Sequence, residues 1–123
     1  MYRICVMPGD GIGQEVIPAA LQVLRSLPLD FEFIPADAGW DCFQRRGVSV
    51  PEDTLAAIRA SNAALFGAVS SPLHKVEGYK SAVVTMRQQL DLYANLRPVA
   101  SMPLASSRQG VDMVIVRENT EGL

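Results

Sequence analysis

Apolar runs along this chain alternate with segments whose apolar residues recur at every third or fourth position. Arg3–Met7 is a short apolar run that ends at Pro8 and Gly9, which is typical of a buried strand. The next apolar residues follow helical spacing and predict a helix over 14–27. Pro18 lies inside that segment and removes one backbone donor, so we expect a late start or a bend.

The same alternation predicts the elements that follow. Ser49-Val-Pro-Glu52 resembles a capping box at the start of a helix. Strands and helices in this order are typical of an α/β fold with a mostly parallel sheet and flanking helices. The expected strands cover 31–36, 64–69, a short piece around Val99 and 111–116, and the expected helices cover 39–46, 52–62 and 82–92.

The length of the chain limits how many domains it forms. Its 123 residues suffice for one compact core and not for two ordinary domains. We expect a first α/β domain over 1–99 and the start of a second domain over 100–123, marked by the polar loop Ser101–Gly110. A parallel sheet needs helices on both faces, and no helix follows the last predicted strand. The sequence is therefore expected to be the front part of a longer protein, with an incomplete fold.

Composition and charge argue against several classes of protein. The formal net charge is −2 and no basic run occurs, so no nucleic-acid partner is indicated. No apolar window approaches the ~18 residues of a membrane span, and the first residues lack the regions of a signal peptide. Cys5 and Cys42 are too few for a disulfide framework and lack metal-ligand spacing, which indicates a reducing, cytoplasmic location. His74 is the single histidine, so a His-rich metal site is excluded.

The glycine-rich stretch PGDGIGQEV covers residues 8–16, between the first predicted strand and helix. It is not a G-x-G-x-x-G motif, because residue 14 is glutamine, and no Gly-Lys-Ser/Thr follows to make a P-loop, so a Rossmann fold is not indicated. Asp10 would repel a pyrophosphate, but its carboxylate is well placed to accept the free amides of the helix. Two interpretations stay open. Composition favours a tight capped turn that lets the helix pack closely on its strand, and the alternative is a ligand-binding loop.

Three of the arginines occupy positions that differ from an ordinary solvated surface. Arg87 lies on the inward-facing side of a predicted helix, Arg97 precedes Pro98 after that helix, and Arg117 ends the last predicted strand. Open α/β sheets bind ligands at the carboxyl ends of their strands. Guanidinium groups that converge there would suit a substrate with two or three carboxylates. The alternative is three unrelated surface ion pairs, which the usual behaviour of surface arginines favours.

Four blocks of sequence occur together in one order and spacing: PGDGIGQEV, LFGAVSSP, MRQQLDLYANLRP and DMVIVRENTEG. They resemble the β-decarboxylating dehydrogenases of the isocitrate/isopropylmalate dehydrogenase family, and the resemblance extends over essentially the whole chain. The VRENTEG run is typical of the isocitrate and homoisocitrate members. The chain therefore most resembles the homoisocitrate dehydrogenases, over their N-terminal part only.

The resemblance implies an activity and a set of partners. Members oxidise a 2-hydroxy-3-carboxy acid with NAD or NADP and then release the 3-carboxylate as CO2, with Mg2+ or Mn2+ acting as Lewis acid. By the resemblance, residues 1–99 begin the cofactor-side domain and residues 100–123 begin the substrate and dimerisation domain. We expect a cytoplasmic homodimer or homotetramer that uses NAD and binds a small di- or tricarboxylic hydroxy acid, with no nucleic acid or membrane as partner.

Individual residues match positions of the family pattern. Arg87, Arg97 and Arg117 match the three arginines that bind the malate-like part of the substrate, which replaces the ion-pair interpretation. Ile12 and Ser71 match positions near the nicotinamide. The resemblance therefore implies that the glycine loop does not bind a pyrophosphate.

Two positions before Arg87 bear on the choice of substrate and disagree. Ser81 matches a serine that isocitrate dehydrogenases direct at the distal carboxylate. Val84 stands where homoisocitrate enzymes can place an arginine, and a valine favours an apolar group such as isopropyl. The expected substrate is homoisocitrate or isocitrate, in lysine biosynthesis through 2-aminoadipate. The alternative is 3-isopropylmalate, in leucine biosynthesis.

The remaining functional groups of the family lie beyond Leu123. The catalytic tyrosine follows the ENTEGL motif directly, and the catalytic lysine, the metal-binding aspartates and the adenosine-binding loop come later. We therefore expect no catalytic residue and no metal ligand within this chain, and the loop that decides between NAD and NADP is absent. A catalytically inert truncated product is the second hypothesis. The tyrosines and lysines that are present match none of these roles: Tyr2, Tyr79, Tyr93, Lys75 and Lys80.

Overall fold

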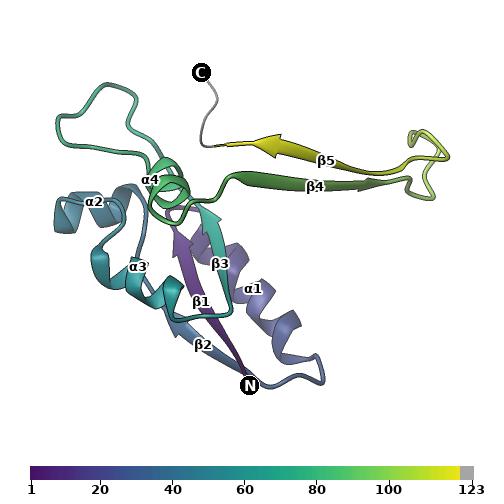
Figure 1. The fold of residues 1–123 in the computed structure, drawn as a ribbon, viewed down its shortest axis with the longest axis horizontal. Coiled ribbons are helices and arrows are strands. Elements are labelled where there is room, and N and C mark those ends of the chain that lie inside the picture. The colour runs from purple at the N-terminus through teal and green to yellow at the C-terminus, as the bar shows by residue number, and fades with distance from the viewer. Residues whose placement is uncertain (120–123) are drawn as a thin grey trace. The chain divides into compact units, whose positions relative to one another are not determined.

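The computed structural model describes residues 1–119 of the chain. They form two compact units, Met1–Leu90 and the part of the chain from Asp91 onward, and each unit is described by itself. The elements follow the chain in this order (Figure 1): β1 (Tyr2–Gly9), α1 (Gly13–Arg25), β2 (Phe31–Pro35), α2 (Trp40–Arg46), α3 (Glu52–Arg59), β3 (Ala63–Ala68), α4 (Ala82–Gln89), β4 (Ala94–Ala100) and β5 (Asp112–Glu118).

The first unit is built on a parallel sheet in which β1 lies between β2 and β3. The register pairs Ile4 of β1 with Phe33 of β2 and with Ala63 of β3. All three strands coincide, within one or two residues at each end, with the apolar runs of the sequence. The three predicted strands of the parallel sheet are therefore confirmed.

The side chains of β1 alternate between two apolar layers, as they must in a strand buried on both faces. Cys5 and Met7 point into a core that includes Leu55 of α3 and is closed by α4. Val6 faces the opposite layer, together with Ile17 of α1. Figure 1 shows α1 on one side of the sheet and α2 and α3 on the other. The predicted α/β fold with flanking helices is confirmed.

Two glycines allow α1 to lie close against the sheet. The helix begins at Gly13, where a Cβ atom would meet the backbone carbonyl of Pro8. A Cβ atom at Gly67 of β3 would meet the same carbonyl and would approach Cγ1 of Ile17 to 2.9 Å. The prediction of a turn that lets the helix pack closely on its strand is therefore confirmed. Pro18 lies inside the helix, which begins at Gly13, so of the two expected effects, a late start or a bend, the late start does not occur.

The starts and ends of the short helices differ in part from expectation. The helix α3 begins after Pro51, and the hydroxyl of Ser49 donates to the backbone carbonyl of Lys80 instead of capping the helix. The predicted capping box is therefore wrong. The helix α2 ends at Gly47, whose φ of 74° is the left-handed conformation that favours glycine. No helix within residues 1–119 is long and apolar enough to cross a membrane.

The second unit is an antiparallel hairpin of β4 and β5. All residues of the two strands are exposed except Asn95, which is half-buried. The last predicted strand is confirmed, but it belongs to a separate sheet and is not parallel. The first compact unit ends at Leu90, and the predicted domain boundary at residue 99 stays a prediction.

Candidate functional site

The carboxyl ends of β1 and β3 lie side by side, since Gly9 pairs with Ala68. The chain leaves β1 toward α1 on one face of the sheet and leaves β3 toward α4, which contributes Met86 to the core on the other face. In open α/β proteins, ligands bind where the connections of adjacent parallel strands diverge in this way. We call residues 9–13 and 69–71 the carboxyl edge.

The two residues predicted to lie near a nicotinamide, Ile12 and Ser71, both belong to the carboxyl edge. Ile12 immediately precedes α1, and its side chain is 58% exposed. Ser71 is exposed in the connection that follows β3. An exposed apolar side chain and a hydroxyl on one edge fit a planar ring with a polar substituent. That these residues contact a cofactor stays a prediction.

Asp10 is the buried polar centre of the carboxyl edge, with only 3% of its surface exposed. Its Oδ2 accepts hydrogen bonds from the backbone N–H groups of Trp40, at 2.7 Å, and Ser70, at 2.8 Å. Its Oδ1 accepts the N–H of Asp41 at 2.9 Å. The carboxylate therefore caps the N-terminus of α2 and not that of α1, whose N-cap residue Ile12 makes no capping hydrogen bond through its side chain. The expected cap of the helix after the glycine loop is wrong.

The helix α4 and the residue before it carry three residues that are predicted to bind the substrate, two of which bear on substrate specificity. Ser81 is the residue before its first turn and is half-buried. Val84 is 47% exposed, and Arg87 is half-buried. A spacing of three places each of these residues next to the following one along the helix surface. The three side chains therefore lie along one side of α4, although their contact with a substrate stays a prediction.

The hairpin brings together the other two predicted arginines. Arg97 of β4 pairs with Ile115, and Arg117 of β5 pairs with Asn95. Because side chains alternate along each strand, Arg97 and Arg117 lie on the same face as diagonal neighbours. The Nε of Arg97 donates to Oδ1 of Asn95 at 3.1 Å, which directs the guanidinium along that face. Arg87 belongs to the first unit, so its convergence with these two stays a prediction.

Four arginines of the first unit differ from the three predicted site residues in having ion-pair partners. Within residues 1–119, no ion pair includes Arg87, Arg97 or Arg117, so the alternative of three surface ion pairs is wrong for the described residues. The side chain of Arg108 in the hairpin turn also has no ion-pair partner within residues 1–119. Arg108 differs from Arg97 and Arg117 only in its position, which is in the turn and not on the strands. The ion-paired arginines are Arg3 with Glu32 at 2.9 Å, Arg45 with Asp37 at 2.6 Å, Arg46 with Asp53 at 3.0 Å and Arg59 with Glu52 at 3.1 Å.

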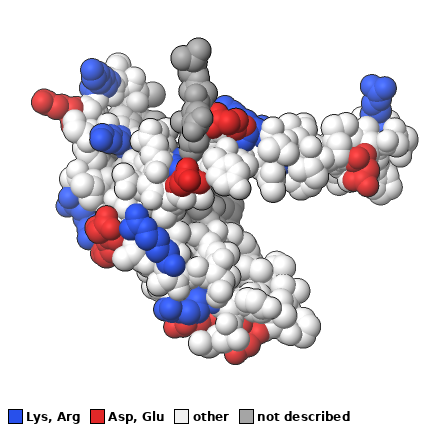
Figure 2. Space-filling model, viewed as in Figure 1, with Lys and Arg blue, Asp and Glu red and all other residues white. Residues whose placement is uncertain are grey.

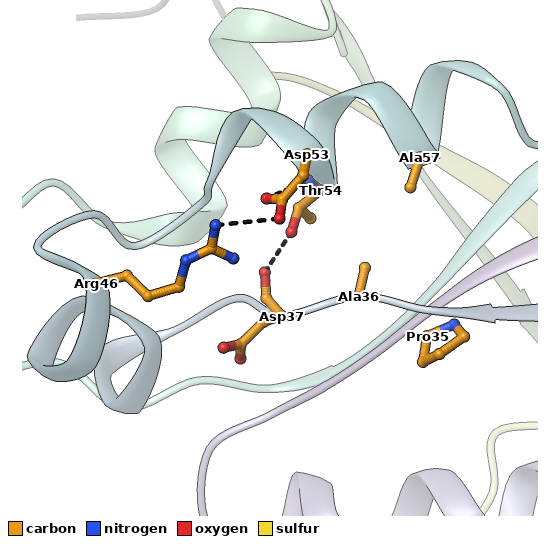
Figure 3. Close-up of a pocket in the computed structure, with 7 residues that line it drawn as sticks. All are labelled: Pro35, Ala36, Asp37, Arg46, Asp53, Thr54 and Ala57. Carbon is orange, nitrogen blue, oxygen red and sulfur yellow. Dashed lines mark hydrogen bonds and ion pairs between the residues drawn. The ribbon is translucent and has the colours of Figure 1, made fainter.

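A pocket separate from the carboxyl edge lies beyond the carboxyl end of β2 and is shown in Figure 3. Its polar groups already have partners: Arg46 bonds Asp53, and Thr54 donates to the backbone carbonyl of Asp37 at 2.7 Å. The hydrogen bond from Arg46 lowers the pKa of Asp53. None of the predicted site residues lines this pocket. In the first unit the candidate site is therefore the carboxyl edge together with α4, and the arginines of the hairpin are described by themselves.

The described residues contain little further reactive chemistry. Both cysteines are free and fully buried. Burial raises the pKa of Cys5, and burial together with the nearby Asp37 carboxylate raises the pKa of Cys42 to about 11, so neither thiol is a nucleophile at neutral pH. Within residues 1–119, no group of three His, Cys, Asp or Glu side chains could hold a metal ion. The residues described here therefore do not fit the divalent metal that the resemblance implies.

The first unit is an open α/β fold, and its carboxyl edge is where such folds bind ligands. The second unit is a hairpin that carries two guanidinium groups on one face. Comparison with known proteins then identifies the family. The family described as isocitrate/isopropylmalate dehydrogenase matches residues 3–123. The chain belongs to the isocitrate/isopropylmalate dehydrogenase family.

Individual relatives show how much of such proteins the chain represents. It is 58% identical over 122 residues to the isocitrate/homoisocitrate dehydrogenase of Thermus thermophilus, which covers 99% of this chain and 36% of the relative. It is 49% identical to the 3-isopropylmalate dehydrogenase of Methanothermobacter thermautotrophicus, over 98% of the chain and 35% of the relative. The chain thus spans about a third of the length of these relatives.

Solved structures give the same result for the fold. A β-decarboxylating dehydrogenase from Thermococcus kodakarensis matches with a TM-score of 0.84 and 46% identity, over 100% of this chain and 35% of that one. An isocitrate dehydrogenase from Methylococcus capsulatus matches with a TM-score of 0.87 and 36% identity, over 100% of this chain and 36% of that one. The predicted family fold is therefore confirmed.

Proposed function

We propose that this chain is the N-terminal part of an NAD-dependent oxidative β-decarboxylase that acts on homoisocitrate or isocitrate. The observation that supports the proposal most directly is the pair Arg97 and Arg117, which share one hairpin face and have no ion-pair partner within residues 1–119. Two adjacent guanidinium groups suit a substrate with adjacent carboxylates, because each can donate two parallel hydrogen bonds. The relatives with isocitrate and homoisocitrate in their names agree with this substrate class.

The residues of this chain have separate tasks in the proposed reaction. Arg97 and Arg117, with Arg87 from the first unit, bind the carboxylates and hold the hydroxyl-bearing carbon in a fixed orientation. Ile12 and Ser71 hold the nicotinamide ring at the carboxyl edge, where NAD accepts a hydride. The metal ligands and the groups that move protons are proposed to lie outside this chain, so no catalytic step is derived for its own residues.

A second candidate substrate, 3-isopropylmalate, is favoured by a specific observation. Val84 is 47% exposed on α4 and so offers an apolar surface to a substrate's variable group. Ser81, half-buried at the start of the same helix, offers a hydroxyl for a distal carboxylate. The relative named 3-isopropylmalate dehydrogenase, at 49% identity, is compatible with the valine. We place homoisocitrate and isocitrate first because two features, Ser81 and the VRENTEG run that is typical of isocitrate and homoisocitrate members, outweigh Val84.

The proposal extends to the organisation of the whole protein. The first unit supplies the cofactor-side domain and the hairpin begins a substrate and dimerisation domain. The complete polypeptide is a homodimer or homotetramer in the cytoplasm, with roles in lysine biosynthesis for homoisocitrate and leucine biosynthesis for isopropylmalate. An inert product of 123 residues is the competing proposal. Intact mass of the purified protein, beside the downstream reading frame, distinguishes the two.

The experiment that tests the function is steady-state kinetics of the complete protein. We expect reduction of NAD at 340 nm with homoisocitrate or isocitrate, with a kcat/KM above that for 3-isopropylmalate, and CO2 release in equal amount. The same measurements with NADP in place of NAD, and with Mn2+ in place of Mg2+, show which cofactor and which metal the protein uses. A protein that oxidises none of the three acids with either cofactor contradicts the proposal, and a preference for isopropylmalate supports the second candidate.

A further inference from the structure

Asp10 links three segments that are far apart in the sequence. The N–H groups of Trp40 and Asp41 lie 30 and 31 residues from it, and that of Ser70 lies 60 residues away. Its own segment precedes Ile12, so one carboxylate joins the glycine loop, the start of α2 and the connection after β3. A buried carboxylate is costly to desolvate and requires such hydrogen bonds to persist.

The geometry requires a charged acceptor. Three donors meet two oxygens, and Oδ2 accepts from both Trp40 and Ser70. An asparagine has one oxygen, so its amide nitrogen would face the N–H of at least one of these three donors. Space also forbids a larger residue nearby, because a Cβ atom at Gly39 would approach Oδ2 of Asp10 to 2.5 Å. The pocket around the carboxylate is thus fitted to its charge and size.

The segment 69–81, which connects β3 to α4, is held at its other end by different contacts. Tyr79 packs edge-on against Trp40 and Phe43, with ring centroids 5.2 and 5.1 Å away. Ser49 bonds the carbonyl of Lys80. Leu73, which lies between the attachment at Ser70 and those at Tyr79 and Lys80, is 96% exposed. The connection 69–81 is therefore held at both ends. Next to Ser71 it is held by two hydrogen bonds, because Asp10 accepts the N–H of Ser70 and the hydroxyl of Tyr79 donates to the Ser70 carbonyl at 3.3 Å.

We infer that Asp10 is a positioning residue for the nicotinamide cofactor: it fixes Ser71 and Ile12 relative to each other without touching the cofactor. This inference rests on the proposed function for the identity of the cofactor. The effect passes through the Ser70 amide, which directly precedes Ser71. The acid is bound mainly by arginines outside this network, so the loss of Asp10 acts on the cofactor more than on the acid.

The test compares Asp10→Asn with Asp41→Asn in the complete protein. The side chain of Asp41 is an exposed carboxylate in the first turn of α2, so Asp41→Asn is a matched change of charge that keeps the backbone N–H donated to Asp10. We expect Asp10→Asn to raise the KM for NAD and the Kd for NADH, measured by fluorescence titration, by about tenfold, the value of one hydrogen bond to a charged group. The KM for the acid should change less than about twofold. Deuterium uptake over 69–71 should rise in Asp10→Asn only.

A second variant, Ser70→Pro, removes one of the three donors and leaves the bonds of Asp10 to α2 in place. It should raise the Kd for NADH in the same direction, which keeps the inference testable if Asp10→Asn does not fold. Equal increases in both KM values, or loss of kcat with unchanged NADH binding, overturn the positioning role. Unchanged uptake over 69–71 overturns it as well. Absence of activity in the unsubstituted protein with all three acids contradicts the proposed function instead, and the NADH titration and uptake still decide the role of Asp10.

Discussion

Four arginines of the first unit and the two arginines on the strands of the hairpin differ in their partners. In the first unit, Arg3, Arg45, Arg46 and Arg59 each contact a carboxylate of the same unit. In the hairpin, the guanidinium groups share a face with apolar residues and have no carboxylate partner within residues 1–119. Arginines that have a carboxylate partner in their own fold are ordinary surface features, whereas the proposal is that Arg97 and Arg117, side by side on the hairpin, bind an anionic ligand.

The comparison extends to burial. The central strand β1 is buried on both faces, with Cys5 and Met7 almost inaccessible. The hairpin exposes large apolar side chains such as Leu96 and Val116, at 64% and 65%. Figure 2 shows charges of both signs spread over the visible face of the first unit, whereas the visible part of the hairpin is mostly uncharged. Two-stranded hairpins are only marginally stable in water, so stability is expected to reside in the first unit.

The largest effect is expected from Arg97 and Arg117, which have no ion-pair partner within residues 1–119. In the complete protein, Arg97→Ala or Arg117→Ala should raise KM for the acid and lower kcat/KM by about 2–5 kcal/mol of transition-state binding, because an ion-paired substrate carboxylate loses its partner. The double variant should show a non-additive loss, since the two side chains are diagonal neighbours. Steady-state kinetics measures both. Arg108→Ala in the hairpin turn is the control, and an equal loss there would show that the assignment is wrong.

Val84→Arg should change the choice of substrate by a slightly smaller amount. A guanidinium beside Arg87 should favour homoisocitrate or isocitrate over isopropylmalate by about 2–4 kcal/mol in relative kcat/KM, because the apolar acid leaves the new charge without a partner. Since Val84 is 47% exposed, the change should not disturb the core. Kinetics on the three acids together with the melting temperature checks this. A uniform loss on every acid with a lowered melting temperature would contradict the role of this position in specificity.

A smaller effect is expected on the free energy of unfolding, which substitutions in the two units should change by different amounts. Gly67→Ala places a methyl group against the carbonyl of Pro8 and the side chain of Ile17, and should lower the free energy of unfolding by about 1–3 kcal/mol. Val116→Ala in the exposed hairpin should lower it by much less. Urea unfolding of the 123-residue chain, followed by circular dichroism, makes the comparison. Equal losses at both positions would show that the hairpin is as important to stability as the parallel sheet.

The smallest effect is expected from an ion-paired arginine. Arg59 contacts Glu52 at 3.1 Å, with both side chains largely exposed. Arg59→Ala should lower the free energy of unfolding by less than about 1 kcal/mol and leave kcat/KM of the complete protein unchanged. Urea unfolding and kinetics measure the two quantities. A loss of activity comparable to that of Arg97→Ala would remove the distinction between the two groups of arginines.

The sequence alone determined the local part of this protein. The apolar run of β1 and the helical spacing of α1 are properties of short segments, so their existence and their α/β order could be predicted. The resemblance of four blocks placed the chain in its family, which the comparisons confirm. The close packing of α1 was also predictable in part, because the glycine-rich turn includes Gly13, where a Cβ atom would meet the backbone carbonyl of Pro8.

The tertiary structure decided what depends on distant partners. The donors to Asp10 lie 30 to 60 residues away, so local reasoning assigned its carboxylate to the adjacent helix and was wrong. Ser49 likewise bonds Lys80 and not the helix that follows it. Strand register placed Arg97 and Arg117 on one face, and the carboxylate partners of the other arginines became known only from the fold. Hydrogen bonds and ion pairs are short-range in space and indifferent to separation along the chain, which is why the pattern of apolar residues could not specify them.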